Sequence, residues 1–191
     1  MCLGLVIAGV AGLGCSGRPA VQGANADPVQ ASNITLPAAQ LYVLETWGTP
    51  PEDTTLVFST RGARTVVLRH APPDNTVFAE LEIPMAALPD SSADSVHLSI
   101  AIRPGLYGVT VTSTPAFKPG AVLRFKYAVH FAAPVAASQK YGNPALFERA
   151  LAVAVEQKDG QFKLLPSTRP AADNLAATIP GPGVYMVAAP R

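Results

Sequence analysis

The chain has few cysteines and few charged side chains. Its two cysteines, Cys2 and Cys15, both lie close to the N-terminus, so the sequence after Cys15 contains no thiol. A disulfide framework, a thiolate metal site and a cysteine nucleophile are therefore excluded from the body of the chain. Charged residues make up 14% of the 191 residues, whereas about 25% is usual for a soluble domain.

Neither sign of charge dominates, and the sequence contains no run of Lys or Arg. Fourteen basic side chains face thirteen acidic ones, which gives a formal net charge of +1. A protein that binds nucleic acid neutralises phosphates with a basic patch, so we expect no nucleic-acid partner. The sequence also lacks a phosphate-binding loop, a dinucleotide-binding fingerprint and a Gly-x-Ser-x-Gly elbow.

The three histidines, His70, His97 and His130, show no ligand spacing on one strand or helix. His97 and His130 fall on the polar faces of their expected strands, which is typical of solvated surface histidines. The acidic loop 89–94 lacks the dense acid spacing and the terminal Glu of a calcium loop.

Glu80 and Glu82 lie on the outer face of one expected strand, where water solvates both carboxylates and an acid–base pair is not favoured. We therefore expect no catalytic residues, no metal and no cofactor. The chain is predicted not to be an enzyme.

Proline and glycine, by contrast, are plentiful, with 19 and 15 residues. Together with frequent Val and Thr, these turn-forming residues favour a β-rich domain over a helical bundle. One domain accounts for the length, with an N-terminal leader and a linker. We predict a leader or short membrane anchor over residues 1–15, a linker over 16–39 and a β-sandwich domain over 40–191.

Residues 1–14 carry no charged or strongly polar side chain. As a helix they would span about 21 Å at 1.5 Å per residue, which is short for a hydrocarbon core of about 30 Å. The run has the length of the apolar region of a signal peptide. Gly-Leu-Gly followed by Cys15 resembles a bacterial lipobox, a resemblance that implies lipidation of Cys15.

A retained short membrane helix and an unlipidated secreted protein are the two alternatives to lipidation. All three place the domain outside the cytoplasm, on the periplasmic side of a bacterial membrane. In the first two cases the N-terminus would anchor the chain to the membrane.

From Leu41 onward, apolar and polar residues alternate with period two, which predicts antiparallel strands with one buried and one wet face. Arg61-Gly62 is expected to turn two strands into a hairpin. Asn143-Pro144 predicts a short helical turn over 144–148. The strands are expected near residues 41–45, 55–60, 64–70, 77–83, 96–102, 107–111, 123–131, 151–155, 162–164, 176–179 and 184–188. This pattern predicts an all-β fold, an antiparallel β-sandwich.

Several Pro/Gly motifs occur in an order that resembles ZU5-type β-sandwich domains. Leu81 to Leu88 (LEIPMAAL) resembles the Ile-Pro turn of that family, and Phe117 to Gly120 (FKPG) resembles its entry into a long amphipathic strand. The hairpin near Gly160 and the closing Gly-x-Tyr strand from Gly183 continue the order. The resemblance covers residues 77–188. It implies a scaffold or contact module without an active site, and it carries over no functional residue.

Three aromatic side chains are candidates for partner contact. Trp47 precedes Gly-Thr-Pro-Pro in a loop-like segment, and exposed tryptophans are common interface anchors. Tyr141 and Phe147 flank a second loop. The alternative for all three is burial against the sandwich.

The first functional hypothesis is a non-catalytic accessory subunit that docks on a larger bacterial membrane complex, with respiratory and photosynthetic assemblies as candidate hosts. The chain has few charged residues, so much of its surface can pack against another protein. The second hypothesis is a free-standing lipoprotein that binds a small ligand or carbohydrate in a loop cleft near Trp47 or Tyr141.

Overall fold

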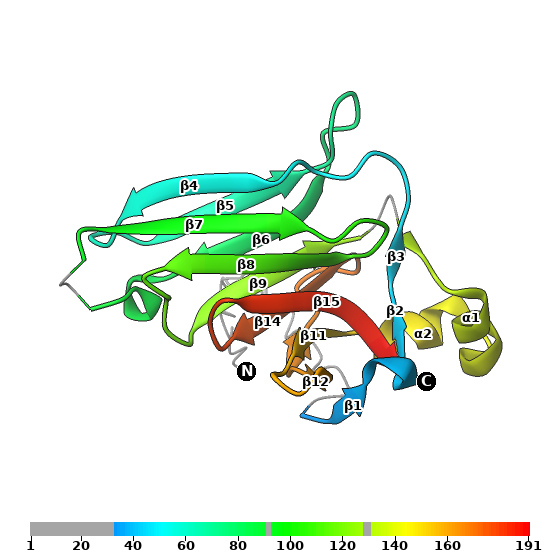
Figure 1. The fold of residues 1–191 in the computed structure, drawn as a ribbon. Helices are drawn as coiled ribbons and strands as arrows, with labels where there is room; N and C mark the ends of the chain where they lie inside the picture. Colours follow the sequence, from blue (N-terminus) through cyan, green and yellow to red (C-terminus); the bar gives the residue numbers. More distant parts are fainter. Residues whose placement is uncertain (1–32, 91–92, 128–130) are drawn as a thin grey trace, which may run out of the picture.

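A computed structural model describes residues 33–90, 93–127 and 131–191. Two antiparallel sheets pack face to face as a β-sandwich, with two short helices at one end (Figure 1). The expected sandwich is therefore confirmed.

The larger sheet has eight strands, all paired antiparallel. Its central strand β15 pairs with β8 and β11, and the short strand β2 adds to the end of β15. Strand β4 forms the edge that is farthest from β1. In spatial order the strands are β1 (Thr35–Pro37), β12 (Gln161–Leu164), β11 (Ala152–Glu156), β15 (Gly183–Pro190), β8 (Gly108–Thr114), β7 (Ser95–Ile102) and β4 (Thr54–Ser59), with β2 (Leu41–Val43) beside β15.

The second sheet has five strands, and a separate two-stranded pair lies beside the helices. In order, the five strands are β13 (Ser167–Thr168), β14 (Asn174–Ile179), β9 (Ala121–Lys126), β6 (Val77–Ile83) and β5 (Arg64–Arg69). The pair consists of β3 (Glu45–Thr46) and β10 (Phe131–Ala132). The helices are α1 (Val135–Tyr141) and α2 (Pro144–Ala150), and the 3-10 turns are η1 (Ala38–Gln40) and η2 (Met85–Ala87).

The core lies between the inner faces of the two sheets. On β7, Val96, Leu98 and Ile100 are buried on one face, as the sequence predicts, and Ile102 at the strand end is half-buried. Aromatic rings fill the centre, where Phe78 of the five-stranded sheet stacks on Tyr107 at 5.0 Å and 11°. A large, fully buried aromatic centre holds the two sheets in a fixed relation.

The predicted hairpin between residues 55–60 and 64–70 is wrong. Strand β4 pairs with β7 of the larger sheet, whereas β5 pairs with β6 of the smaller one. The chain therefore crosses from one sheet to the other between Ser59 and Arg64. Phe58 and Leu68 are both buried in the core, and the crossing lets each sheet contribute one of them. A hairpin would place both strands in one sheet.

Two further expectations need correction. Within the predicted linker 16–39, Thr35–Pro37 forms β1 and pairs with β12, so the chain joins the sheet before residue 40. The single strand expected over 123–131 ends at Lys126, and Phe131 pairs with Thr46 in the separate pair. Alternation continues past Lys126 in the sequence, so periodicity alone does not reveal this break.

The helical region is larger than the turn expected over 144–148. The side chain of Asn143 caps α2 by accepting a hydrogen bond of 2.9 Å from the backbone N–H of Leu146, which confirms the predicted helix start. The helix extends to Ala150, and α1 precedes it without having been predicted. Helix α1 ends at Tyr141 and is capped by Gly142, whose φ of 76° favours glycine.

Candidate docking surface

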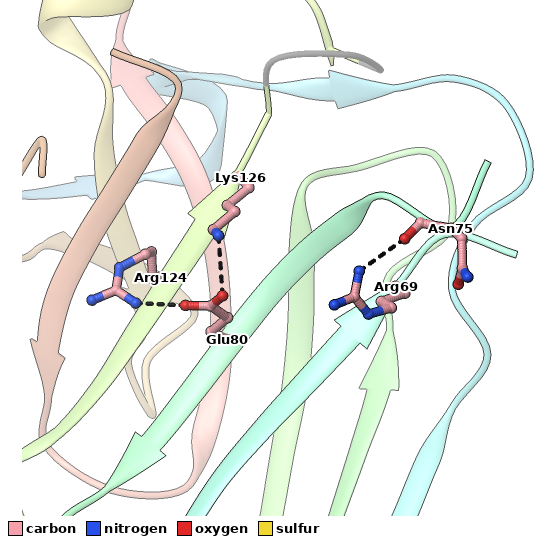
Figure 2. Close-up of polar contacts among 5 residues, drawn as sticks. All are labelled: Arg69, Asn75, Glu80, Arg124 and Lys126. Carbon is pink, nitrogen blue, oxygen red and sulfur yellow. Dashed lines mark hydrogen bonds and ion pairs between the residues drawn. The ribbon is translucent and has the colours of Figure 1, made fainter. Parts of the chain in front are cut away.

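The outer faces of the two sheets differ in charge. On the five-stranded sheet, the carboxylate of Glu80 accepts from Nη1 of Arg124 at 2.5 Å and lies 3.1 Å from Nζ of Lys126 (Figure 2). Glu80 lies directly opposite Arg124 across the β6–β9 pair. Burial works to raise the pKa of Glu80, but the two cations outweigh it and hold that pKa below its ordinary value of 4.5. This face carries a paired, solvated ion cluster.

Charge also marks the β5 edge of this sheet. Arg69 donates a hydrogen bond of 3.0 Å to the backbone carbonyl of Asn75 across the β5–β6 turn (Figure 2). Glu82 is exposed two residues beyond Glu80 on the same strand face. Burying this face against a partner would strip water from several ions, which is costly.

The outer face of β4, β7 and β8 in the larger sheet has a different character. Its three strands are in full register, so side chains on opposite partners form rows across them. One row joins Thr55, Ser99 and Thr112, and the Oγ1 of Thr55 donates to the Oγ of Ser99 at 3.3 Å. The outward residues of the three strands, which we call the hydroxyl face, are Thr55, Val57, Ser59, Ser95, His97, Ser99, Ala101, Thr110, Thr112 and Thr114.

The hydroxyl face contains no Asp, Glu, Lys or Arg on these three fully described strands. Thr112 and Thr114 are exposed, and Ser99 and Thr110 are half-buried. Val57 is 57% exposed. The face therefore presents hydroxyl and methyl groups on a continuous sheet. The alternation of Thr110, Thr112 and Thr114 is visible in the sequence, but only the strand order shows that Ser99 and Thr55 extend the same rows.

Trp47, a predicted contact residue, follows β3 in the loop that leads to β4. Its side chain is 56% exposed. Gly48 has a φ of 84°, and the ring Nδ1 of buried His70 lies 3.1 Å from the carbonyl oxygen of Thr49. The loop that carries Trp47 is therefore attached to the core through Thr49, two residues further along the chain.

Tyr141 and Phe147, the other two predicted contact residues, lie together at the helical end of the sandwich. Their rings are 5.6 Å apart, and Phe147 is completely buried. Tyr141 is half-buried, and its hydroxyl donates to the carbonyl of Pro190 at 2.7 Å. Burial raises the pKa of Tyr141, with a smaller contribution from Tyr42. The structure places both side chains in packing between α1, α2 and the last strand.

The histidines show no metal-binding geometry in the part of the chain that the structure describes. His70 is 3% exposed, and its ring packs edge-on against Phe78 at 5.4 Å. His97 is exposed on β7, as the sequence predicts. Among the described residues, no group of three His, Cys, Asp or Glu side chains could hold a metal ion.

Several sequence predictions fall outside the described residues. Cys15, the apolar run 1–14 and His130 are among them, and so are Ser91 and Ser92 of the acidic loop. Within the described ranges, the helices are too short or too polar to cross a membrane.

Comparison with known proteins gave no match. No family model, no curated protein and no solved structure matches the chain.

Proposed function

We propose that this chain is a non-catalytic, extracytoplasmic β-sandwich subunit that docks on a larger bacterial membrane protein complex through its hydroxyl face. The observation that carries the proposal is the absence of charge from the outward residues of β4, β7 and β8. Respiratory and photosynthetic assemblies are the candidate hosts. Trp47 is the second contact that we assign to the partner.

Desolvation is the physical reason for choosing this face. The centre of a protein–protein interface is depleted of charged residues, because each buried ion loses its hydration. Hydroxyl groups are less costly to desolvate and can form hydrogen bonds to a partner's backbone. The face that carries Glu80, Arg124 and Lys126 would lose more solvation on docking.

Rigidity favours the same face. Threonine is β-branched and therefore restricted at χ1, so ordering Thr110, Thr112 and Thr114 on binding costs little side-chain entropy. Their strand is the neighbour of both β7 and β15, which fixes its backbone before a partner arrives.

The membrane location in this proposal rests on the N-terminal sequence. An apolar run followed by Cys15 resembles a lipoprotein leader, and lipidation or retention of the run would anchor the sandwich. The ZU5-like order of motifs supports a role as a contact module, because domains of that type act as scaffolds. We propose that membrane anchoring and protein contact are parts of the same function.

Native separation of mildly solubilised source membranes tests the proposal when this chain is located by mass spectrometry. We expect co-migration with a complex much larger than 19.8 kDa. Migration near the mass of the single chain or of a homodimer would contradict the proposal. It would favour a free-standing lipoprotein that binds a small ligand or carbohydrate.

A further inference from the structure

The edges of the two sheets differ in how they are protected against adding another strand. Exposed edge strands offer unpaired N–H and C=O groups, and proteins usually protect them with charges, proline, bulges or short length. At the far edge of the larger sheet, β1 has three residues and ends in Pro37. At one edge of the smaller sheet, β13 has only two residues.

Strand β5, the other edge of the smaller sheet, is protected in three ways. It begins with Arg64 and ends with Arg69. Arg64 lies opposite buried Ile83, so it is on the core side of the sheet yet exposed at its rim. The register with β6 also shifts between Leu68 and Arg69. Such irregularities and inward charges disfavour edge-to-edge pairing.

Strand β4 has none of these features. Its six residues, Thr-Thr-Leu-Val-Phe-Ser, include no charge and no proline, and all six pair with β7 without a shift in register. Val57 at its centre is 57% exposed, and Leu56 is only partly buried against the core. It is the one six-residue edge strand within the described ranges that lacks such protection.

We propose that β4 pairs antiparallel with β4 of a second copy of this chain, which joins the two eight-stranded sheets into one. A two-fold axis perpendicular to the sheet must match outward residues with outward residues, because a slip of one residue exchanges the faces. Centring the axis on Val57 satisfies this condition. Val57 then faces its own copy, Thr55 faces Ser59, and Leu56 faces Phe58.

Charge at the two ends of β4 favours a second copy as the occupant. Asp53 precedes the strand and Arg61 follows it, each four residues from Val57. Antiparallel pairing centred on Val57 therefore brings Asp53 of one copy close to Arg61 of the other. The two-fold axis places one such pair at each end of the two strands. Antiparallel pairing of β5 with its own copy would instead place the terminal arginines Arg64 and Arg69 of the two copies at the same ends of the strand pair, where like charges repel.

The pairing would also bury more of Leu56, which is only partly buried against the core. Leu56 and Phe58 lie on the core side of β4, and Phe58 is 9% exposed. Leu56 of each copy would contact Phe58 of the other copy across the new strand pair. The hydroxyl faces of the two copies would become continuous.

Sedimentation of the purified full-length chain in mild detergent tests the pairing. We expect a concentration-dependent dimer for the wild type. Val57→Lys introduces two like charges at the two-fold axis and should weaken dimerisation at least tenfold. Val67→Lys is the matched control, because Val67 is also an exposed edge valine, on β5, at 42%. It should leave dimerisation unchanged.

Oxidative cross-linking gives a second readout that does not depend on weakening the dimer. Opposite residues of an antiparallel pair have Cβ atoms about 5 Å apart, so Val57→Cys should form a disulfide-linked dimer under mild oxidation. Wild type measures the background from Cys2 and Cys15, and Val67→Cys should not exceed it. A monomeric wild type, or equal behaviour of the Val57 and Val67 variants in both assays, would overturn the proposal.

Discussion

The hydroxyl of Tyr141 donates a hydrogen bond of 2.7 Å to the carbonyl oxygen of Pro190 and so connects helix α1 to the end of β15. The Tyr141 ring meets Tyr42 edge-on at 6.5 Å, and the guanidinium of Arg191 lies 4.9 Å from the Tyr42 ring. The Arg191 side chain also donates from Nε to the carbonyl of Leu41 at 3.0 Å. These contacts connect α1 with β2 and with the end of β15.

Tyr141→Phe should lower the free energy of unfolding by about 1 kcal/mol, because it removes this hydrogen bond and keeps the ring. Urea denaturation followed by circular dichroism measures the change. Lys140→Ala is the control. The Nζ of Lys140 donates to the same carbonyl in a longer, exposed hydrogen bond of 3.4 Å, whose loss should cost less. An equal loss for both variants would show that the hydroxyl has no special role.

Glu80→Gln should lower the free energy of unfolding at pH 7 by about 1 kcal/mol, because it removes the charge that Arg124 and Lys126 stabilise. The folded-state pKa of Glu80 lies below its ordinary value. Its ionisation therefore stabilises the fold above that ordinary value, and the contribution is lost as the pH falls through the folded-state pKa. The difference between variant and wild type should shrink below pH ~4.

Glu82→Gln provides the matched control for Glu80, because Glu82 lies on the same strand face and is exposed. Its effect on stability should stay within about 0.5 kcal/mol at every pH. Thermal denaturation between pH 3 and pH 7 measures both variants. A Glu80→Gln difference that persists unchanged at pH 3 would contradict an electrostatic cause.

Trp47→Ala should reduce partner binding much more than it reduces stability. A side chain that is 56% exposed contributes little to folding, so we expect a loss of less than about 1 kcal/mol in unfolding experiments. Tryptophan anchors in interfaces contribute about 2 kcal/mol or more, which corresponds to roughly 30-fold in affinity. If the variant unfolds while its soluble fraction still binds normally, Trp47 is a structural residue.

The sequence predicts the strands well because each has one buried and one wet face. Val96, Leu98 and Ile100 alternate with His97 and Ser99, and the structure confirms this pattern on β7. The cap at Asn143 is equally local, since the hydrogen bond to Leu146 depends only on residues three apart. Local periodicity and capping are therefore readable from one chain.

Long-range pairing is not readable in the same way. The turn at Arg61-Gly62 is compatible with a hairpin and with a crossing between sheets, and only the packing of Phe58 and Leu68 from opposite sheets decides between them. The same limit applies to the docking surface. Thr112 and Thr55 are 57 positions apart in sequence, and their common row depends on β7 lying between β4 and β8.

The central claim, docking through the hydroxyl face, is tested most directly by placing one charge on each outer face of the sandwich. Thr112 on β8 and Thr178 on β14 are both exposed threonines on outward strand faces. Thr112→Lys and Thr178→Lys are compared by native separation of source membranes in which each variant replaces the wild-type chain. We predict that the Thr178 variant stays with the large complex and the Thr112 variant is released from it. Co-migration of both variants with the complex would contradict docking through this face.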